Sequence, residues 1–144
     1  IIYDTMWNAT RRMAESIAQG LREADPTLTV KLYNSAVDDK NDIVTEVFKS
    51  KAILVGSPTI NYGFLYSIGG IMEMIRGLKF KNKKAAAFGS YGWSGESVKQ
   101  ITGLLKEAGF ELVNDGLRCQ WNPDMESQNL CRDFGRDFAK SLAK

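Results

Sequence analysis

Hydroxyl and amide side chains gather in the first ten residues of the chain, directly after an apolar run. Thr5, Asn8 and Thr10 lie between residues 1–4 and a stretch over 9–23 whose apolar residues recur at helical spacing. The amino-terminal end of a helix leaves backbone N–H groups unpaired and carries partial positive charge, so it can bind a phosphate without Lys or Arg. The alternative is an ordinary helix cap at Asn8 or Thr10, which this stretch favours when it is taken alone.

Two later loops change that balance, because each combines aromatic side chains with glycine after a short apolar run. The run 52–55 leads into the loop 56–63, and the run 85–88 leads into the loop 89–95. Such continuous runs are typical of parallel strands that are buried on both faces. Aromatic rings beside backbone donors and acceptors suit a flat heteroaromatic ring, although packing aromatics and turn glycines explain either loop alone. The three loops together favour a planar, phosphorylated ligand.

The elements around these loops alternate between strand and helix. We expect strands at 1–4, 28–33, 52–55, 85–88 and 112–121, the last interrupted at 114–116, and helices at 9–23, 38–50, 68–78, 96–108 and 124–144. Phe48, Leu130, Phe134 and Phe138 are expected to face the core. This order predicts one α/β domain over residues 1–144, a doubly wound five-stranded parallel sheet with helices on both faces. Ligands bind such sheets at the carboxyl ends of the strands, where the three loops lie.

The composition excludes several kinds of chemistry. The chain has no His, which removes Ser-His-Asp and Cys-His catalysis and most zinc or non-haem iron sites. The net charge of +2 is too small to argue for nucleic acid, and neither a membrane span nor a signal peptide is visible. Cys119 and Cys131 form no CxxC motif, which fits a reducing cytoplasm. Redox chemistry in this chain would therefore need an organic cofactor.

The start of the chain is unusual, because Ile1 already lies within an apparent strand and is no initiator Met. We expect the sequence to be either one domain of a longer chain or a chain whose disordered start is missing.

The loops and their order resemble those of flavodoxins, and most of all the flavodoxin-like domain of flavodiiron proteins, a family that includes the flavorubredoxins. The motifs that carry the resemblance are Tyr3-Asp4-Thr5-Met6 with Asn8 and Thr10, Val55-Gly56-Ser57-Pro58-Thr59-Ile60-Asn61, Gly77-Leu78, and Phe88-Gly89-Ser90 with Gly92-Trp93-Ser94-Gly95. The resemblance covers nearly the whole chain, and the last motif is the most specific.

The resemblance implies FMN as the cofactor and the same flavodoxin-like fold. The first loop would bind the phosphate, and the other two would bind the ring. The cofactor-binding residues that it implies are Thr5, Met6, Trp7, Asn8, Ala9 and Thr10 in the first loop, Pro58, Thr59, Ile60, Asn61, Tyr62 and Gly63 in the second, and Ser90, Tyr91, Gly92, Trp93, Ser94 and Gly95 in the third. Trp7 and the aromatic residues of Tyr62-Gly63-Phe64 depart from the usual flavodoxin pattern, so the identity of the ring that stacks on the flavin stays open.

The resemblance also implies partners. In flavodiiron proteins, a separate metallo-β-lactamase-like domain carries a di-iron site that reduces oxygen or nitric oxide. That site needs histidines, which this chain lacks. We therefore expect the chain to be the electron-delivering part, with a rubredoxin or rubredoxin-like domain as electron donor. We also expect a homo-oligomeric, cytoplasmic full-length protein without nucleic-acid or membrane partners.

Two other classes of protein share this architecture. A flavodoxin-fold NAD(P)H:quinone reductase would be an enzyme in its own right and would need room for a second substrate over the flavin. A response-regulator receiver needs a phospho-acceptor Asp after the third strand and an acidic pair after the first. Here the third strand ends in Gly56-Ser57, and the turn after the first strand offers only Asp4. The receiver is nearly excluded, whereas the reductase stays the alternative.

Overall fold

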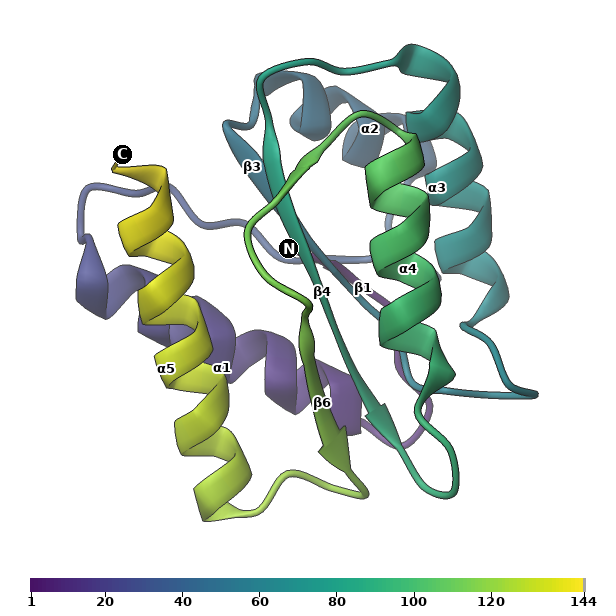
Figure 1. The fold of residues 1–144 in the computed structure, drawn as a ribbon, viewed down its shortest axis with the longest axis vertical. Helices are drawn as coiled ribbons and strands as arrows, with labels where there is room; N and C mark the ends of the chain where they lie inside the picture. Colours follow the sequence, from purple (N-terminus) through teal and green to yellow (C-terminus); the bar gives the residue numbers. More distant parts are fainter. Residues whose placement is uncertain (144) are drawn as a thin grey trace.

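The computed structural model describes residues 1–143, which form a parallel sheet with helices on both faces (Figure 1). The strands are β1 (Ile2–Tyr3), β2 (Tyr33–Asn34), β3 (Ala52–Gly56), β4 (Lys84–Tyr91), β5 (Glu111–Leu112) and β6 (Leu117–Gln120). The helices are α1 (Ala9–Ala24), α2 (Lys40–Lys49), α3 (Tyr66–Leu78), α4 (Glu96–Glu107) and α5 (Met125–Leu142). The strand order is β2-β1-β3-β4-β5, with β6 also paired to β4. The predicted doubly wound α/β fold is therefore confirmed.

The fifth position of the sheet is divided between β5 and β6, and both pair with β4. Lys84 pairs with Glu111 and Phe88 pairs with Leu117. The chain therefore advances four residues along β4 and six residues along the segment that contains β5 and β6. The extra residues form the interruption that the sequence predicted at 114–116. Gly116 has φ +95° there, and a Cβ on it would lie 2.7 Å from the carbonyl oxygen of Ala87. A glycine is needed at this bend because both its conformation and its surroundings exclude a side chain.

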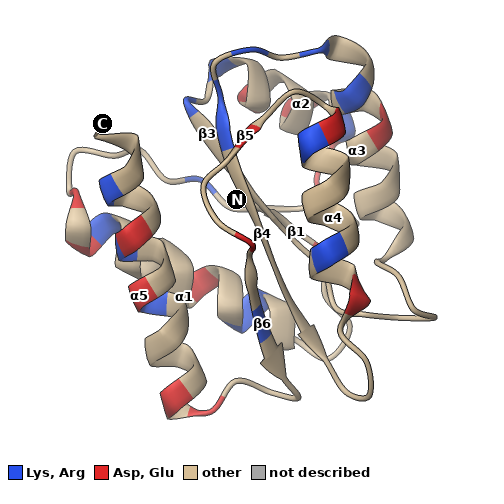
Figure 2. Cartoon of the chain, in the orientation of Figure 1, with Lys and Arg blue, Asp and Glu red and all other residues tan. Residues whose placement is uncertain are grey.

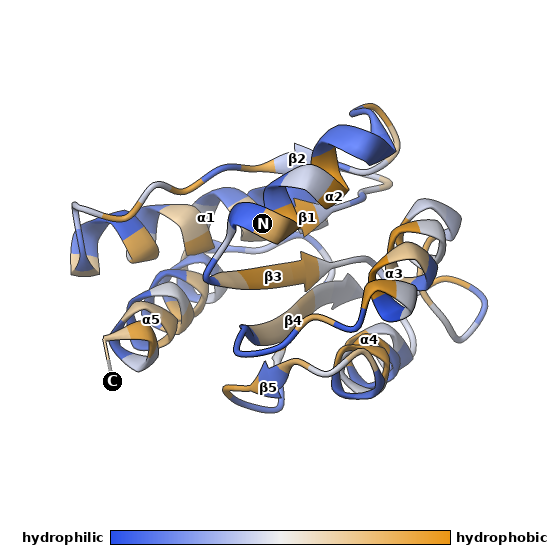
Figure 3. Cartoon of the chain, turned by 90° about the horizontal axis from the view of Figure 1, so that it is seen from above, coloured by the Kyte–Doolittle hydropathy of each residue, from blue (hydrophilic) through white to orange (hydrophobic). Residues whose placement is uncertain are grey.

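Each face of the sheet carries its own apolar core (Figure 3). The first core lies between the sheet and α2, α3 and α4, and the second lies between the sheet and α1 and α5. Helices α1 and α5 approach closely through two glycines. A Cβ on Gly20 would lie 2.0 Å from the carbonyl oxygen of Arg132, and a Cβ on Gly135 would lie 2.2 Å from that of Ile17. The helix contact therefore depends on the absence of side chains at these two positions.

The predicted strand over 28–33 is wrong for most of its length. Only Tyr33–Asn34 forms a strand, β2, and it pairs with Ile2–Tyr3 of β1. Leu28, Val30 and Leu32 are partly buried and pack on the core beside α1 and α5, as their alternation suggested. They form no strand, because β1 begins only at Ile2 and no other strand of residues 1–143 lies beside them.

Two residues that were expected in the core lie on the surface. Phe48 is 57% exposed and Leu130 is 52% exposed. The buried side of α5 contains Cys131, Gly135, Phe138 and Leu142, and Leu130 lies one residue from that series. A shift of one residue rotates a side chain by about 100° around a helix, which is enough to expose it. Phe48 sits beside buried Val47, and its ring meets the edge of Phe80 at 4.7 Å between centroids.

Candidate functional site

Three loops meet at the edge of the sheet where β1, β3 and β4 end, which is the lower edge in Figure 1. Ser90 of β4 connects them. Its hydroxyl lies 2.9 Å from the hydroxyl of Thr10 in α1, and its carbonyl oxygen accepts a hydrogen bond of 2.9 Å from the N–H of Thr59. Both Thr10 and Ser90 are buried. The first and second loops are therefore held to the same residue of the central strand.

The start of α1 is open toward this edge. Asn8 is the N-cap residue and has a left-handed backbone with φ 65°, but no side chain forms a capping hydrogen bond there. Thr10 lies inside the helix and bonds to Ser90, so it does not cap either. The alternative of a side-chain cap at Asn8 or Thr10 is therefore wrong. The first N–H groups of α1 remain available to an anion, and the helix dipole favours one.

Thr5 lies in the same loop and has an unusual hydroxyl. Its Oγ1 atom is buried and has no hydrogen-bond partner among the described residues. Its backbone N–H donates to Asp4 Oδ1 at 2.7 Å, which fixes the loop at this residue. A buried hydroxyl without a partner costs about 1–3 kcal/mol, so a ligand oxygen here would be favoured. The residues of the first loop thus fit a phosphate group.

The second loop makes a tight turn that presents an aromatic ring. Ile60 and Gly63 exchange backbone hydrogen bonds of 2.9 and 2.8 Å. The two residues between them, Asn61 and Tyr62, have φ of 49° and 62°, as in a type I′ turn. Gln100 of α4 donates to the carbonyl oxygen of Tyr62 at 2.7 Å. The turn is thereby anchored, and the side chain of Tyr62 is exposed.

The third loop begins later than predicted. Ser90 and Tyr91 belong to β4, because that strand continues beside β6 as far as the pair Tyr91 and Gln120. Trp93 in the loop is 90% exposed, and its ring meets that of Trp121 edge-on, with centroids 5.2 Å apart. Arg118 lies 5.4 Å over the ring of Tyr91. Exposed rings at one edge suit a stacked ligand or a docked partner.

Trp121 was absent from the predicted site. It directly follows β6, its N–H donates to the carbonyl oxygen of Tyr91 at 2.7 Å, and a Cβ on Gly92 would lie 3.1 Å from its ring. The carboxyl end of a strand parallel to β4 must lie at this same edge. The expected strand at 117–121 could therefore have identified Trp121 from the sequence.

The remaining predicted residues lie at the same edge. Met6, Trp7 and Asn8 are exposed on the first loop, and Ala9 begins α1. Pro58 and Thr59 directly follow β3 and its continuation at Ser57, while Ser94 and Gly95 precede α4. Thr59 also lies 3.0 Å from the hydroxyl of Ser97 in α4, so the second loop and α4 are joined. The structure therefore brings all the predicted positions to one edge, although Thr10 and Ser90 lie beneath its surface.

Three further findings concern metal ions, cysteines and membrane-spanning helices in the part of the chain that the structure describes. Residues 1–143 contain no group of three or more His, Cys, Asp or Glu that could hold a metal ion. Cys119 and Cys131 are buried free thiols with sulfur atoms 4.0 Å apart. No helix in this range is long and apolar enough to span a bilayer.

The strand order and the position of the loops define a class of protein. In a sheet of order 2-1-3-4-5, all strands are parallel, but successive strands are added in opposite directions on the two sides of the boundary between β1 and β3, and mononucleotide ligands bind at that switch point. The first and second loops lie there. The molecule therefore has the architecture of doubly wound α/β domains that bind a mononucleotide at this edge of the sheet. Residues 1–135 match the family model described as flavodoxin, and the chain belongs to this family.

Individual relatives agree with this assignment. The chain is 50% identical over 143 residues to an anaerobic nitric oxide reductase flavorubredoxin of Klebsiella pneumoniae, covering 99% of this chain and 30% of the relative. It superimposes on the rubredoxin oxygen:oxidoreductase of Desulfovibrio gigas with a TM-score of 0.93 and 33% identity, covering 99% of this chain and 35% of that one. An archaeal flavodoxin superimposes with a TM-score of 0.87 and 28% identity, covering 99% of this chain and 96% of that one. The chain thus spans about a third of the first two relatives.

These findings confirm the resemblance that the sequence carried, both to flavodoxins and to the corresponding part of flavodiiron proteins. FMN is the cofactor of the flavodoxin family, which confirms that prediction at the level of the family.

Proposed function

We propose that this chain is an FMN-binding electron-transfer domain that passes electrons to a di-iron site in a separate domain, for the reduction of oxygen or nitric oxide. The observation that carries the proposal is the meeting of three loops around Ser90, beside the uncapped start of α1 and the unpaired hydroxyl of Thr5. Relatives named for nitric oxide reduction and for rubredoxin-oxygen chemistry support the choice of acceptor. Bound FMN would supply the electron-carrying ring.

In this proposal the first loop holds the phosphate and the other two hold the ring. The N–H groups that open α1 and the hydroxyls of Thr5 and Thr10 are the phosphate donors. Tyr62, Trp93 and the backbone of the second and third loops surround the ring, and Trp121 contacts Trp93 edge-on. The other predicted residues, from Met6 to Ala9, from Pro58 to Gly63 and from Ser90 to Gly95, complete the walls.

The partners belong to the same proposal. A metallo-β-lactamase-like domain with the di-iron site receives the electrons, and a rubredoxin or rubredoxin-like domain donates them. Residues 1–144 act as one flavodoxin-like domain of a homo-oligomeric cytoplasmic protein. The two relatives are about three times as long as this chain, which supports the proposal that the di-iron site lies in a separate domain.

The identity of the cofactor tests the proposal directly. Purified chain, incubated with a mixture of FMN, FAD and NAD and then desalted, is expected to retain FMN alone. The loop after β1 has hydroxyls for one phosphate but no GxGxxG motif for a pyrophosphate. Heating releases the cofactor for chromatography against standards. Retention of FAD, or of no flavin, would contradict the proposal.

Direct reduction by NADPH distinguishes the proposed function from a quinone reductase. Under anaerobic conditions, NADPH added to the FMN-loaded chain is expected to bleach the flavin absorbance only slowly. Rapid bleaching that saturates with NADPH, followed by reoxidation with a quinone, would favour the reductase.

Removal of Trp93 tests the proposed ring site. Trp93→Ala is expected to raise the fluorescence of bound FMN several-fold, because a contacting indole quenches a flavin. Protein stability should change by less than about 0.5 kcal/mol, since the side chain is largely exposed. Phe48→Ala is the control. Phe48 lies in the last turn of α2, near the amino end of β3 and away from this edge, so its removal should leave the emission unchanged. Equal emission in both variants would assign the stacking ring to Tyr91 or Tyr62.

The charge around the ring makes a further prediction about its potentials. Figure 2 shows few charged residues in the loops at the lower edge, and the ranges 57–63 and 89–95 contain no Asp or Glu. Asp4 and Glu96 flank these loops, while Arg118 adds positive charge beside Tyr91. Negative charge develops at the ring when it takes up two electrons, and nearby carboxylates would oppose it by up to a few kcal/mol each.

We therefore expect the second electron to enter at a potential close to the first, with little dependence on salt. Potentiometric titration of the FMN-loaded chain at two ionic strengths measures both steps. A second potential far below the first, rising markedly with added salt, would reveal an acidic field and contradict this prediction.

A further inference from the structure

Asp4 is a buried carboxylate directly before the phosphate loop, where a ligand of the same charge is expected. Asp4 is 8% exposed, and none of the ion pairs among residues 1–143 includes it. Burying a carboxylate without a cation is costly, and its charge would oppose a phosphate bound nearby. Charge attraction therefore does not explain an acidic residue at this position, whereas the hydrogen bonds of its side chain do.

Two serines fix the position of this carboxylate. The hydroxyl of Ser67 donates to Oδ2 of Asp4 at 2.5 Å, and the hydroxyl of Ser35 lies 2.6 Å from that of Ser67. Because Ser67 has a single hydroxyl proton and gives it to Asp4, Ser35 must donate to Ser67. Ser35 is buried directly after β2, and Ser67 lies in the first turn of α3. Asp4, Ser67 and Ser35, here called the serine relay, thus join the ends of β1 and β2 to the start of α3.

The other oxygen of the carboxylate holds Thr5. Oδ1 of Asp4 accepts a hydrogen bond of 2.7 Å from the backbone N–H of Thr5, whereas Oγ1 of Thr5 is buried and has no partner among residues 1–143. One donor of Thr5 is therefore bound within the protein, and the other is left for a ligand. The orientation of Thr5 in the loop thus depends on a carboxylate that the serine relay fixes.

We propose that Asp4 is a positioning residue of the phosphate site, whose carboxylate fixes Thr5 so that the hydroxyl of Thr5, and not its N–H, is presented to the phosphate. The inference rests on the proposed function, because the ligand is the phosphate of FMN. Asp4 acts on that ligand through Thr5. It therefore sets how strongly the chain prefers a flavin that carries a phosphate over the same flavin without one.

The serine relay also predicts a substitution that the site tolerates. In Asp4→Asn, the side-chain oxygen still accepts from the N–H of Thr5, and the new amide group donates to Ser67. Ser67 can then donate to Ser35, and Ser35 to the carbonyl oxygen of Tyr3, which lies 3.3 Å away. Every group stays paired, while the negative charge is removed. Asp4→Asn should therefore bind FMN at least as tightly as the unchanged chain.

The test measures the affinity of the purified chain for FMN and for riboflavin, which lacks the phosphate. Asp4→Ala is expected to weaken FMN binding about tenfold and riboflavin binding by less than about twofold. The same substitution in a Thr5→Val chain should change FMN binding by less than about twofold, because the hydroxyl through which Asp4 acts is already gone. Ser67→Ala keeps Asp4 but removes one bond to it, and should weaken FMN binding alone by about threefold.

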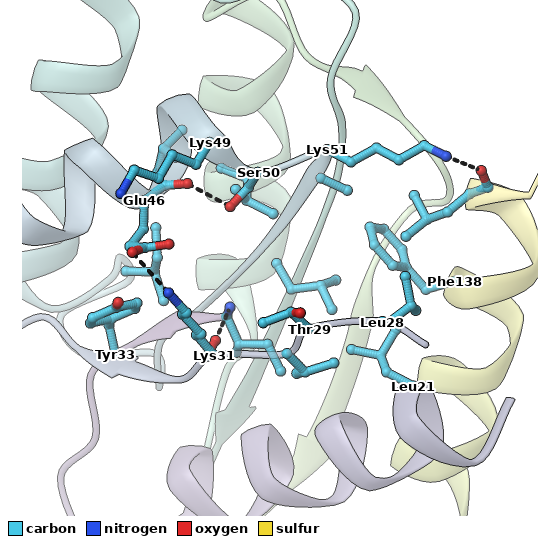
Figure 4. Close-up of a pocket in the computed structure, with 18 of the residues that line it drawn as sticks. Leu21, Leu28, Thr29, Lys31, Tyr33, Glu46, Lys49, Ser50, Lys51 and Phe138 are labelled. Carbon is cyan, nitrogen blue, oxygen red and sulfur yellow. Dashed lines mark hydrogen bonds and ion pairs between the residues drawn. The ribbon is translucent and has the colours of Figure 1, made fainter. Parts of the chain in front are cut away.

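Asp25→Ala is the matched control. The carboxylate of Asp25 also accepts from one backbone N–H and one hydroxyl, both of Thr27, at 3.0 and 2.5 Å. Asp25 lies in sequence between Leu21 and Leu28, which line a groove at the amino ends of β1 and β3, at the opposite edge of the sheet from the three loops (Figure 4). Its replacement should leave the affinities for both flavins unchanged.

Three results would overturn the proposal. Equal losses of FMN and riboflavin affinity in Asp4→Ala would show that Asp4 supports the fold of the loop without acting on the phosphate. A loss in Asp4→Asn as large as that in Asp4→Ala would show that the charge of Asp4 matters and its hydrogen bonds do not. Failure of the unchanged chain to bind either flavin would remove the proposed function and this inference with it, whereas the first two results concern Asp4 alone.

Discussion

Replacing Thr10 with Val is expected to weaken FMN binding by about 10- to 150-fold, because it removes a donor to the phosphate while keeping the shape of the side chain. A hydrogen bond to a charged group contributes about 1.5–3 kcal/mol, and each 1.4 kcal/mol is a factor of ten in affinity. Thr10 is fully buried at the open start of α1, and its hydroxyl already meets that of Ser90. The loss of affinity is measured by titrating the apoprotein with FMN while the quenching of flavin fluorescence is monitored.

Three further variants separate this role from a purely structural one. Thr10→Ser restores the hydroxyl and should recover most of the affinity. Ser90→Ala removes the hydroxyl that pairs with Thr10 but keeps the backbone bond from Thr59, so it should lower stability more than affinity. Thr45→Val makes the same chemical change on the exposed side of α2, where Thr45 bonds to its own helix at Asn41, and should leave FMN binding unchanged. If Thr10→Val lowers only the melting temperature, Thr10 merely pairs with Ser90.

The position of the site could be predicted from the sequence because strands and the loops after them are local patterns. The runs 52–55 and 85–88, each with the loop behind it, are recognisable over twelve residues or fewer, and parallel strands must bring such loops to one edge. The contact between Thr10 and Ser90 spans 80 residues of sequence. Nothing local marks those two hydroxyls as partners, so only the folded sheet reveals them.

The errors have equally specific causes. Leu130 and Phe48 were placed in the core because they match a helical spacing, but a neighbouring series of residues, Cys131 or Val47, packs better against the sheet. Trp121 is missing from the predicted site because that site is built only from the loops after the first, third and fourth strands. The loop after the last strand lies at the same edge but is left out of that site. The strand at 28–33 was predicted from its alternation alone, whereas a strand also requires a neighbour to pair with.

The close approach of β3 and β4 beneath the site leads to the prediction with the largest expected effect on the fold. Gly89 lies in β4 next to the residue where β3 continues as Ser57. A Cβ on Gly89 would lie 2.2 Å from the carbonyl oxygen of Ser57 and 2.9 Å from the hydroxyl of Ser97. That hydroxyl donates to the same carbonyl oxygen at 3.0 Å, so the bond fills the space beside the glycine.

Gly89→Ala is therefore expected to destabilise the chain by about 3 kcal/mol or more. Overpacking against backbone typically costs about 1–3 kcal/mol, and loss of the buried bond between Ser97 and Ser57 adds about 1 kcal/mol. FMN affinity of the folded protein should also fall, since Thr59 donates to Ser90 and bonds to Ser97 immediately beside this contact. Urea unfolding gives the stability, and FMN titration well below the melting temperature gives the affinity.

Two glycine substitutions elsewhere make the expected result specific. Gly135→Ala creates an equally short contact, 2.2 Å from the carbonyl oxygen of Ile17, in the packing of α1 on α5. It should lower stability by a similar amount but leave FMN affinity nearly intact. Gly103→Ala lies within α4 with nothing within 4 Å, so it should raise stability by roughly 0.5–1 kcal/mol through helix propensity. Equal losses of FMN affinity in Gly89→Ala and Gly135→Ala would mean that affinity follows global stability, and that the contact between β3 and β4 has no particular role in shaping the site.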